Sequence, residues 1–203
     1  MTINLGYACI NMALQKQKIC SNRGMIKRTF QSKGIAYASE LALINVKALK
    51  KIIEWNNANG IKVYRMTSCL FPWFSEYDIF TLPDIDAIAD VLSQAGEIAM
   101  SGGQRLSFHP GPFNCLGSPN EDVVKKTIAE LDAHSVQMDL MGLPKSTQAK
   151  INIHVGGAYG EHDKALARFC NNFTKLAPNT QARLTVENDD RTSLYSTKML
   201  YDG

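Results

Sequence analysis

The chain has 203 residues, 45% of them apolar and 20% charged, an ordinary globular composition with enough residues for one sizeable core. Its net charge of +3 is compatible with a polyanionic partner but too small to argue for one. Five cysteines, an odd number with none spaced as CxxC, argue against a disulfide framework and a thiolate zinc knuckle and for a reducing compartment. No apolar run could span a bilayer and no leader pattern opens the chain. We therefore expect an intracellular protein, cytoplasmic or, in a eukaryote, nuclear.

Short β-rich runs alternate with longer segments of helical periodicity. Strands are predicted at residues 3–8, 61–66, 104–108, 150–155 and 182–187. The first helix, predicted over residues 38–59, is supported by apolar residues at roughly helical spacing: Leu41, Val46, Leu49 and Ile53. The second, over residues 83–101, is predicted to end at Gly102-Gly103, where a positive φ is available.

Three further helices follow. The third is predicted over residues 118–142, and its first residues match a capping box with proline at the first helical position: Ser118, Pro119 and Glu121. The fourth covers residues 162–176 and stops before Pro178. The segment 192–203 has the pattern of the start of a fifth helix.

Strict alternation of strands and helices predicts right-handed βαβ units around a parallel sheet. Five strands are compatible with an open doubly wound sheet or with a (β/α)8 TIM-type barrel truncated after about five βα units. The helical pattern at the end of the chain has no cap or tail, which favours the truncated barrel. We expect residues 1–203 to form a single incomplete α/β barrel domain without the three C-terminal βα units.

Polar side chains gather where the predicted strands end. In a parallel barrel these ends converge on one face, and active sites lie on that face. All five strands have such residues at or shortly after their ends: Tyr7, Asn11, Arg65, Cys69, His109, His154 and Glu187.

Three of these residues form a plausible metal-binding set. His109, His154 and Glu187 each follow an apolar strand directly, and a charged carboxylate there is costly unless it is paired or binds a cation. A lone histidine at a strand end is as often a satisfied structural residue. We expect the three side chains to converge on one face, with ligand atoms within roughly 3–8 Å of one another.

Two loops at the same face have residues that suit a nucleic acid. The turn Gly156-Gly157-Ala158-Tyr159-Gly160 would let backbone N–H groups approach a phosphate, although a tight turn alone explains such glycines. Lys164, in the first turn of the next helix, would hold a phosphate or simply be solvated. After His109, the Pro112-Phe113 pair offers an aromatic ring that stacks on bases or anchors the loop. Aromatic residues of the second loop are expected to pack on the rim: Phe71, Trp73 and Phe74.

Five segments in order resemble the UV damage endonuclease family. They are Leu5-Gly6-Tyr7 with Asn11, Tyr64-Arg65-Met66 through Leu70-Phe71-Pro72, Leu106 to Gly111, Ile153 to Gly160 with Lys164, and Val186 to Asp190. Single motifs such as His-Pro-Gly are weak, but their order and spacing fit across essentially the whole chain.

The resemblance implies a barrel with a divalent metal cluster, most often manganese, with magnesium or zinc as alternatives. It implies incision immediately 5′ of a UV photoproduct or another lesion in double-stranded DNA, without a membrane or an obligate protein partner. The implied metal ligands are His109, His154, Glu187 and Cys69. The implied catalytic residues are Glu187, His154 and Lys164. The implied DNA- and lesion-binding positions are Tyr7, Asn11, Pro112, Phe113, Gly156, Gly157 and Tyr159.

This sequence departs from the family pattern at three places. Pro112 stands where a glutamine is usual before the probing aromatic, and it offers no side-chain hydrogen bond. Cys69 stands where a His or Asp ligand is expected, and a thiolate is soft for manganese or magnesium. The last three strands, which supply further ligands in the family, are absent.

Two alternatives remain open from the sequence. A sugar isomerase or epimerase also places Glu and His at the strand ends of a metal-dependent barrel. The chain is also compatible with an inactive truncated fragment that binds DNA weakly or packs with another chain.

Overall fold

The computed structural model describes residues 3–191 and 193–202. Its sheet has five parallel strands in the order β1-β2-β3-β4-β5. The strands are β1 (Gly6–Ala8), β2 (Val63–Arg65), β3 (Arg105–Phe108), β4 (Ala149–Ile153) and β5 (Leu184–Val186). Each overlaps a predicted run, so all five strand predictions are confirmed, although every strand is shorter than predicted.

Seven α-helices and two 3-10 turns accompany these strands in the described part of the chain, and all but the last of them precede β5. They are α1 (Met12–Gln15), α2 (Lys27–Ala58), η1 (Phe74–Glu76), η2 (Ile79–Thr81), α3 (Ile85–Ser101), α4 (Glu121–Leu140), α5 (His162–Phe173), α6 (Pro178–Arg183) and α7 (Thr197–Asp202). None of these helices combines the length and apolar character needed to cross a membrane.

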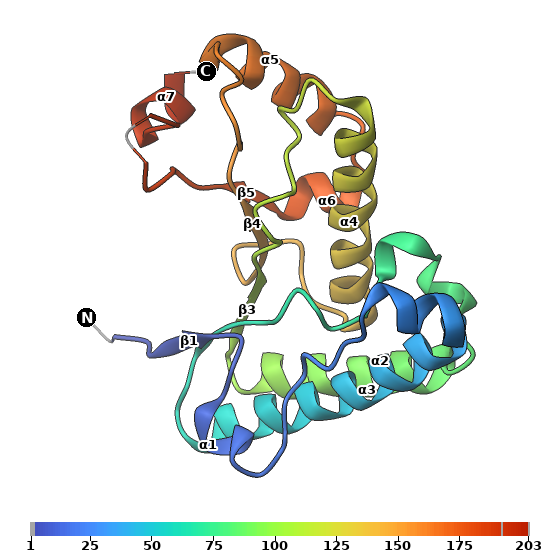
Figure 1. Cartoon of the computed structure of the whole chain (residues 1–203). Coiled ribbons are helices and arrows are strands. Elements are labelled where there is room, and N and C mark those ends of the chain that lie inside the picture. Colours follow the sequence, from blue (N-terminus) through green and yellow to red (C-terminus); the bar gives the residue numbers. More distant parts are fainter. Residues whose placement is uncertain (1–2, 192, 203) are drawn as a thin grey trace.

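The sequential strand order separates the two folds that the sequence left open. A doubly wound sheet reverses its strand order at a switch point and has helices on both faces. Here the order never reverses, so right-handed crossovers place the connecting helices on one face. Figure 1 shows α2, α3, α4 and α6 on the same side of the sheet. The barrel prediction is confirmed, with five parallel strands of the eight that close a (β/α)8 barrel.

Helix α2 begins at Lys27, eleven residues before the predicted start. Its first turns are separated from the rest by Gly34, whose φ of 64° and ψ of −158° interrupt the helix. The early part lacks apolar periodicity and is held by packing, because the Phe30 ring stacks on Trp73 at 5.7 Å. The predicted apolar face of the later part is buried as expected: Leu41, Val46, Leu49 and Ile53.

The predicted capping box of α4 is wrong. The helix begins at Glu121, and Asn120 is its N-cap, with a side-chain oxygen that accepts from the N–H groups of Asp122 and Val123. Ser118 instead accepts from the N–H of Asn120, which closes a tight turn before the helix. Pro119 therefore lies outside the helix rather than at its first position.

The C-terminal elements differ from the predictions in two ways. The predicted helix 162–176 ends at Phe173, and the short helix α6 then starts with a proline at its first turn. Arg183, predicted in the last strand, closes α6 instead, fully buried with its guanidinium 2.7 Å from Asp139. Helix α7 confirms part of the predicted helix 192–203, of which residues 192 and 203 lie outside the described residues.

Alternate residues of the strands face opposite sides of the sheet. Side chains on the helix side form the core, and these are almost fully buried: Tyr64, Leu106, Phe108, Ala149, Ile151 and Ile153. The concave side, which faces the axis of a complete barrel, has Ser107 on β3, Asn152 on β4 and Thr185 on β5. The same alternation determines which residues just after the strands face the concave side and can therefore converge.

Candidate metal centre

His109, His154 and Glu187 each occupy the position directly after a strand, at the ends of β3, β4 and β5. Counting in twos along each strand places all three on the concave side, two residues after Ser107, Asn152 and Thr185 respectively. The expected convergence is confirmed, because one ligand atom from each of the three lies within 4.8 Å of the others.

The carboxylate of Glu187 lies between the two imidazoles. Its Oε1 is 2.6 Å from Nε2 of His109 and 3.1 Å from Nε2 of His154. The two rings are 5.4 Å apart and inclined at 61°, so both point at one region from different directions. All three side chains are partly exposed, so an ion or a substrate could reach them.

The outer nitrogens of both imidazoles face acceptors. Nδ1 of His109 lies 3.2 Å from the carbonyl of Pro110. Nδ1 of His154 is buried without a hydrogen bond, and the nearby Oδ1 of Asp189 lies 3.4 Å from it. If each Nδ1 is the protonated nitrogen, both Nε2 lone pairs point at the Glu187 carboxylate. In that state a bound cation would neutralise the three electron-rich atoms that face one another, and this tautomer is the one that metal-binding histidines adopt. The donor set therefore fits a divalent metal.

Two cavities flank the triad. His154 and Asp189 line one of about 390 Å³, together with Pro112, Gly156 and Gly157. His109 lines the other, of about 520 Å³. The second cavity also has aromatic and polar walls, formed by Phe71, Trp73, Phe74, Cys69 and Glu130. The predicted rim aromatics thus contribute to a cavity wall beside the triad.

Cys69 lines the same second cavity as His109 but is outside the group of ligand atoms that lie within 4.8 Å of one another. Partial burial raises the pKa of its thiol, with a smaller opposite effect from a hydrogen bond to Thr67. A protonated thiol is a poor ligand, so Cys69 would bind only a metal that displaces its proton.

Tyr7 and Asn11 lie in a hydrogen-bonded cluster on the helix side. Tyr7 pairs in register with Tyr64, and its hydroxyl donates to Oδ1 of Asn56 on α2 at 2.7 Å. Asn11 donates to the Tyr7 hydroxyl at 2.9 Å and caps α1 by accepting from the N–H of Leu14. Burial raises the pKa of Tyr7. The cluster therefore fixes the chain after β1 to α2.

The loop after β3 presents its aromatic residue to solvent. Phe113 is 88% exposed, whereas Pro112 lines the cavity beside His154. An apolar ring held outside the core in this way is free to contact a partner.

The glycine turn after β4 lies at the edge of the same cavity. Gly156 has a φ of 96°, and a side chain there would collide with the sulfur of Cys115. Tyr159 also has a positive φ, and Arg168 approaches its ring at 5.8 Å. Lys164 is separate from the triad, since it is largely exposed and its Nζ lies 2.8 Å from Glu161, the N-cap residue of α5.

Two residues at the site have no predicted role from the sequence. Asp189 is part of the Val186 to Asp190 segment, but only the fold brings its carboxylate to His154. Glu130 is on α4 and lines the second cavity, where burial raises its pKa and Asn114 donates to it at 2.9 Å. No local signal distinguishes Glu130 from a solvated helix residue.

A singly wound parallel sheet with this donor set at the carboxyl ends of its strands defines a barrel-type α/β protein with a candidate metal-binding triad. The chain belongs to the UV-endonuclease UvdE family, which matches residues 3–201.

Relatives support this assignment over nearly the whole chain. The UV-damage endonuclease of Schizosaccharomyces pombe is 34% identical over 191 residues, covering 92% of this chain and 31% of its own length. The UV DNA damage endonuclease of Clostridium perfringens is 30% identical over 190 residues, covering 93% of this chain and 44% of its own length.

The crystal structure of SacUVDE matches with a TM-score of 0.83 and 30% identity, covering 98% of this chain and 64% of that one. The chain spans between 24% and 57% of the length of the first curated relatives it matches.

Proposed function

We propose that this chain is the N-terminal part of one barrel domain of a metal-dependent DNA repair endonuclease. The enzyme would incise the backbone immediately 5′ of UV photoproducts and other lesions. The convergence of His109, His154 and Glu187 at the strand ends is the observation that supports this most. Membership of the UvdE family favours this function over a sugar isomerase or epimerase.

His109, His154 and Glu187 would hold the metal. When bound, such a metal lowers the pKa of water and stabilises charge on the leaving oxygen of a phosphodiester. The residues of the chain set its surroundings. The Pro110 carbonyl and Asp189 would orient the imidazoles by accepting from their Nδ1 atoms, so that both Nε2 lone pairs face inward. Glu187 supplies negative charge between them.

Manganese is the proposed metal, with magnesium or zinc as alternatives. Imidazole together with carboxylate suits several divalent ions, so the triad alone does not select one. Cys69 would add a ligand for zinc, which accepts thiolate, more readily than for manganese.

The proposed partner is damaged double-stranded DNA, with no obligate protein partner. Gly156 and Gly157 would present backbone to a phosphate beside His154, and Tyr159 and Phe113 would contact bases. Lys164 would take part in catalysis only after its ion pair with Glu161 breaks. Tyr7 and Asn11 are proposed to contact the lesion, which would require the hydrogen bonds that join them to each other and to Asn56 to open. Pro112 would stiffen the probing loop. We place the enzyme in the cytoplasm, or in the nucleus of a eukaryote.

Plasmid nicking tests this proposal directly. The full-length protein with manganese should relax irradiated supercoiled plasmid and leave unirradiated plasmid intact, and EDTA should stop the reaction. Mapping the new ends on a duplex with one defined photoproduct should place the cut directly 5′ of it. Activity that survives EDTA, or equal nicking of both plasmids, would contradict the proposal.

A further inference from the structure

Positive charge is concentrated at the start of the chain. Residues 1–39 contain six Lys and Arg side chains, and all 19 Asp and Glu residues lie from Glu40 onward. The first fifth of the chain therefore has a charge of +6, and the remainder is net negative. The six cations lie between residues 16 and 33, here called the basic segment: Lys16, Lys18, Arg23, Lys27, Arg28 and Lys33.

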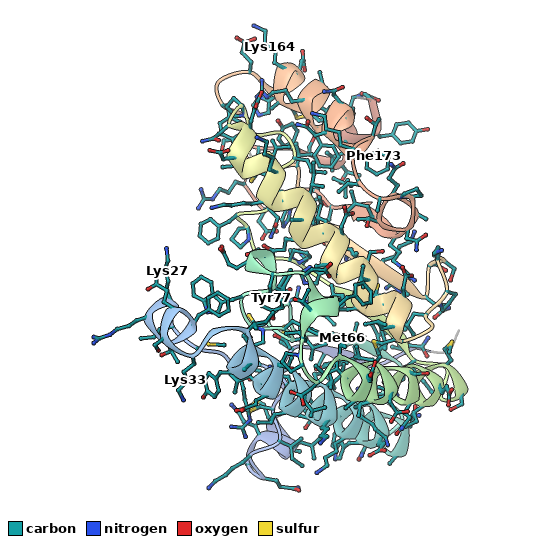
Figure 2. The ribbon with its side chains drawn as sticks, turned by 90° about the vertical axis from the view of Figure 1, so that its right-hand side faces the viewer. Lys27, Lys33, Met66, Tyr77, Lys164 and Phe173 are labelled. Carbon is teal, nitrogen blue, oxygen red and sulfur yellow. The ribbon has the colours of Figure 1, made fainter. Side chains whose placement is uncertain are left out.

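All six side chains of the basic segment are exposed. Among the described residues, no ion pair involves any of them, although seven other ion pairs form elsewhere. Figure 2 shows Lys27 and Lys33 pointing outward from the first turns of α2, at the edge of the molecule. Lys33 lies 4.0 Å over the Tyr37 ring, which keeps its charge. Cations that have no carboxylate partner leave a local positive field that the net charge of the chain hides.

The basic segment is held rigidly despite its exposure. The buried Asn45 side chain bonds the backbone of Arg23 through both its N–H and its carbonyl, at 2.9 and 2.8 Å. The indole of Trp73 donates to the carbonyl of Met25 at 2.8 Å, and Phe30 stacks on the same ring. A surface fixed in this way loses little conformational entropy when it binds a partner.

The basic segment is continuous with the candidate site. Gly24 and Met25 line the cavity that also contains His109. On its other side, Lys18 and Arg23 line a groove of about 210 Å³ with Lys47 and Lys51 of α2, and no acidic side chain of the described residues lines that groove. The positive surface therefore runs from the edge of the metal site outward along α2.

We infer that the basic segment binds the phosphate backbone of the duplex on one flank of the lesion, an inference that rests on the proposed function. Duplex DNA presents one negative charge per ~1.7 Å along its axis and extends well beyond any cut site. A row of exposed cations on an anchored backbone, beginning beside the site, suits the extended charge of DNA better than the surface of a compact acidic protein. Such contacts position the duplex and are blind to sequence and damage.

The test compares two matched triple variants of the full-length protein. In the first, Lys27, Arg28 and Lys33 are each changed to Gln. In the control, three exposed lysines outside the segment are changed to Gln: Lys125, Lys126 and Lys145. Binding to irradiated and intact duplex is measured by anisotropy in EDTA at several salt concentrations, and circular dichroism checks that both variants are folded.

The first variant should lower the slope of log affinity against log salt by about 3, since each phosphate that the protein no longer neutralises removes roughly 0.9 from the slope. At ~0.1 M salt its affinity should fall roughly tenfold or more, equally for both duplexes. The control should change the slope by less than about 1. Replacing Lys27 and Lys33 with Arg should retain parental binding, because the charge is kept.

If the Lys27, Arg28 and Lys33 variant binds duplex as tightly as the control variant does, the inference is overturned. It is also overturned if the parent protein binds polyglutamate as strongly as it binds duplex, since the surface would then suit an acidic polypeptide. Binding in EDTA does not require cleavage. Failure of the parent to nick damaged DNA would therefore contradict the proposed function alone, and an unchanged salt slope would contradict only the role of the basic segment.

Discussion

The two sides of the sheet use histidine in opposite ways. His109, on the concave side, is partly exposed, and its Nε2 lies against the Glu187 carboxylate. His134, on α4, is fully buried on the helix side, where the ring centroids of Phe108 and Phe74 lie 4.7 and 5.1 Å from its own in edge-to-face arrangements. Its Nδ1 bonds the carbonyl of Glu130 at 2.8 Å, and burial lowers its pKa to about 4.

The difference shows that the side of the sheet, more than the residue type, separates a candidate ligand from a structural residue. Phe108 and His109 are neighbours, yet one packs on His134 and the other joins the triad. Each prediction below is a way to contradict or refine this contrast.

The largest expected effect is on the concave side. Glu187→Gln should reduce nicking of irradiated plasmid by at least ~10³-fold, because the amide keeps the shape but loses the charge a divalent metal needs. Affinity for DNA should stay within a few-fold, as measured by anisotropy. Unchanged incision with saturating manganese would remove Glu187 from the metal site.

On the helix side, His134 should make stability depend on pH. Its folded pKa of about 4 lies below its usual value of 6.5, so between these pH values the unfolded chain binds a proton that the folded chain does not. Stability should therefore fall by up to about 3 kcal/mol as the pH drops through that window, with no contribution above it. Urea unfolding of the parent and of His134→Gln measures this. An identical pH dependence in both would mean that His134 titrates normally.

Asp189→Asn tests the support of the triad. Loss of the carboxylate next to Nδ1 of His154 should weaken metal binding roughly 10- to 100-fold, measured by calorimetry with manganese. Asp190→Asn is the matched control, since Asp190 is exposed and borders the same cavity. Equal affinities of the two variants would show that Asp189 does not orient the ligand.

Asn11→Ala separates a structural role from a lesion contact. The variant loses the N-cap of α1 and the donor to Tyr7, which should cost about 1 kcal/mol of stability in urea unfolding without changing metal affinity. Reduced discrimination between damaged and intact duplex would support the proposed lesion contact. Discrimination equal to the parent would leave Asn11 a structural residue.

The smallest effect is expected for Phe113→Ala. Because the ring is 88% exposed, its removal should leave stability and metal content unchanged. A ring that wedges between weakened base pairs favours damaged sites, so the preference for damaged over intact duplex should fall a few-fold. Incision rates on both duplexes measure this preference. If the ratio is unchanged, Phe113 has no wedge role.

Much of the fold was predictable because it depends on local patterns. Apolar spacing identified the core face of α2, and short β-rich runs identified every strand. The start of α2 was missed because Phe30 is fixed by Trp73, more than forty residues away in sequence. The cap of α4 was misassigned because Ser118 and Asn120 are both good caps, and only the turn between them decides which one acts.

The candidate site was also predictable only in part. The three residues directly after β3, β4 and β5 were found because they share one position relative to their strands. The same rule also selected Tyr7, which lies within β1 and faces α2. Without the exact ends of a strand, the sequence does not show which side of the sheet each of its residues faces. The approach of Asp189 to His154 could not be predicted, because it depends on the path of the loop after β5.

Gly34 has a consequence for how this protein tolerates change. Its φ of 64° and ψ of −158° are close to a conformation that almost only glycine adopts. Open space surrounds the position where a β-carbon would stand, so no neighbour restricts the residue there. Any other residue there would carry backbone strain, and rotating the first turns of α2 to relieve it would break the stack of Phe30 on Trp73 that holds them. One achiral residue thus sets the direction in which the cations of those turns are presented.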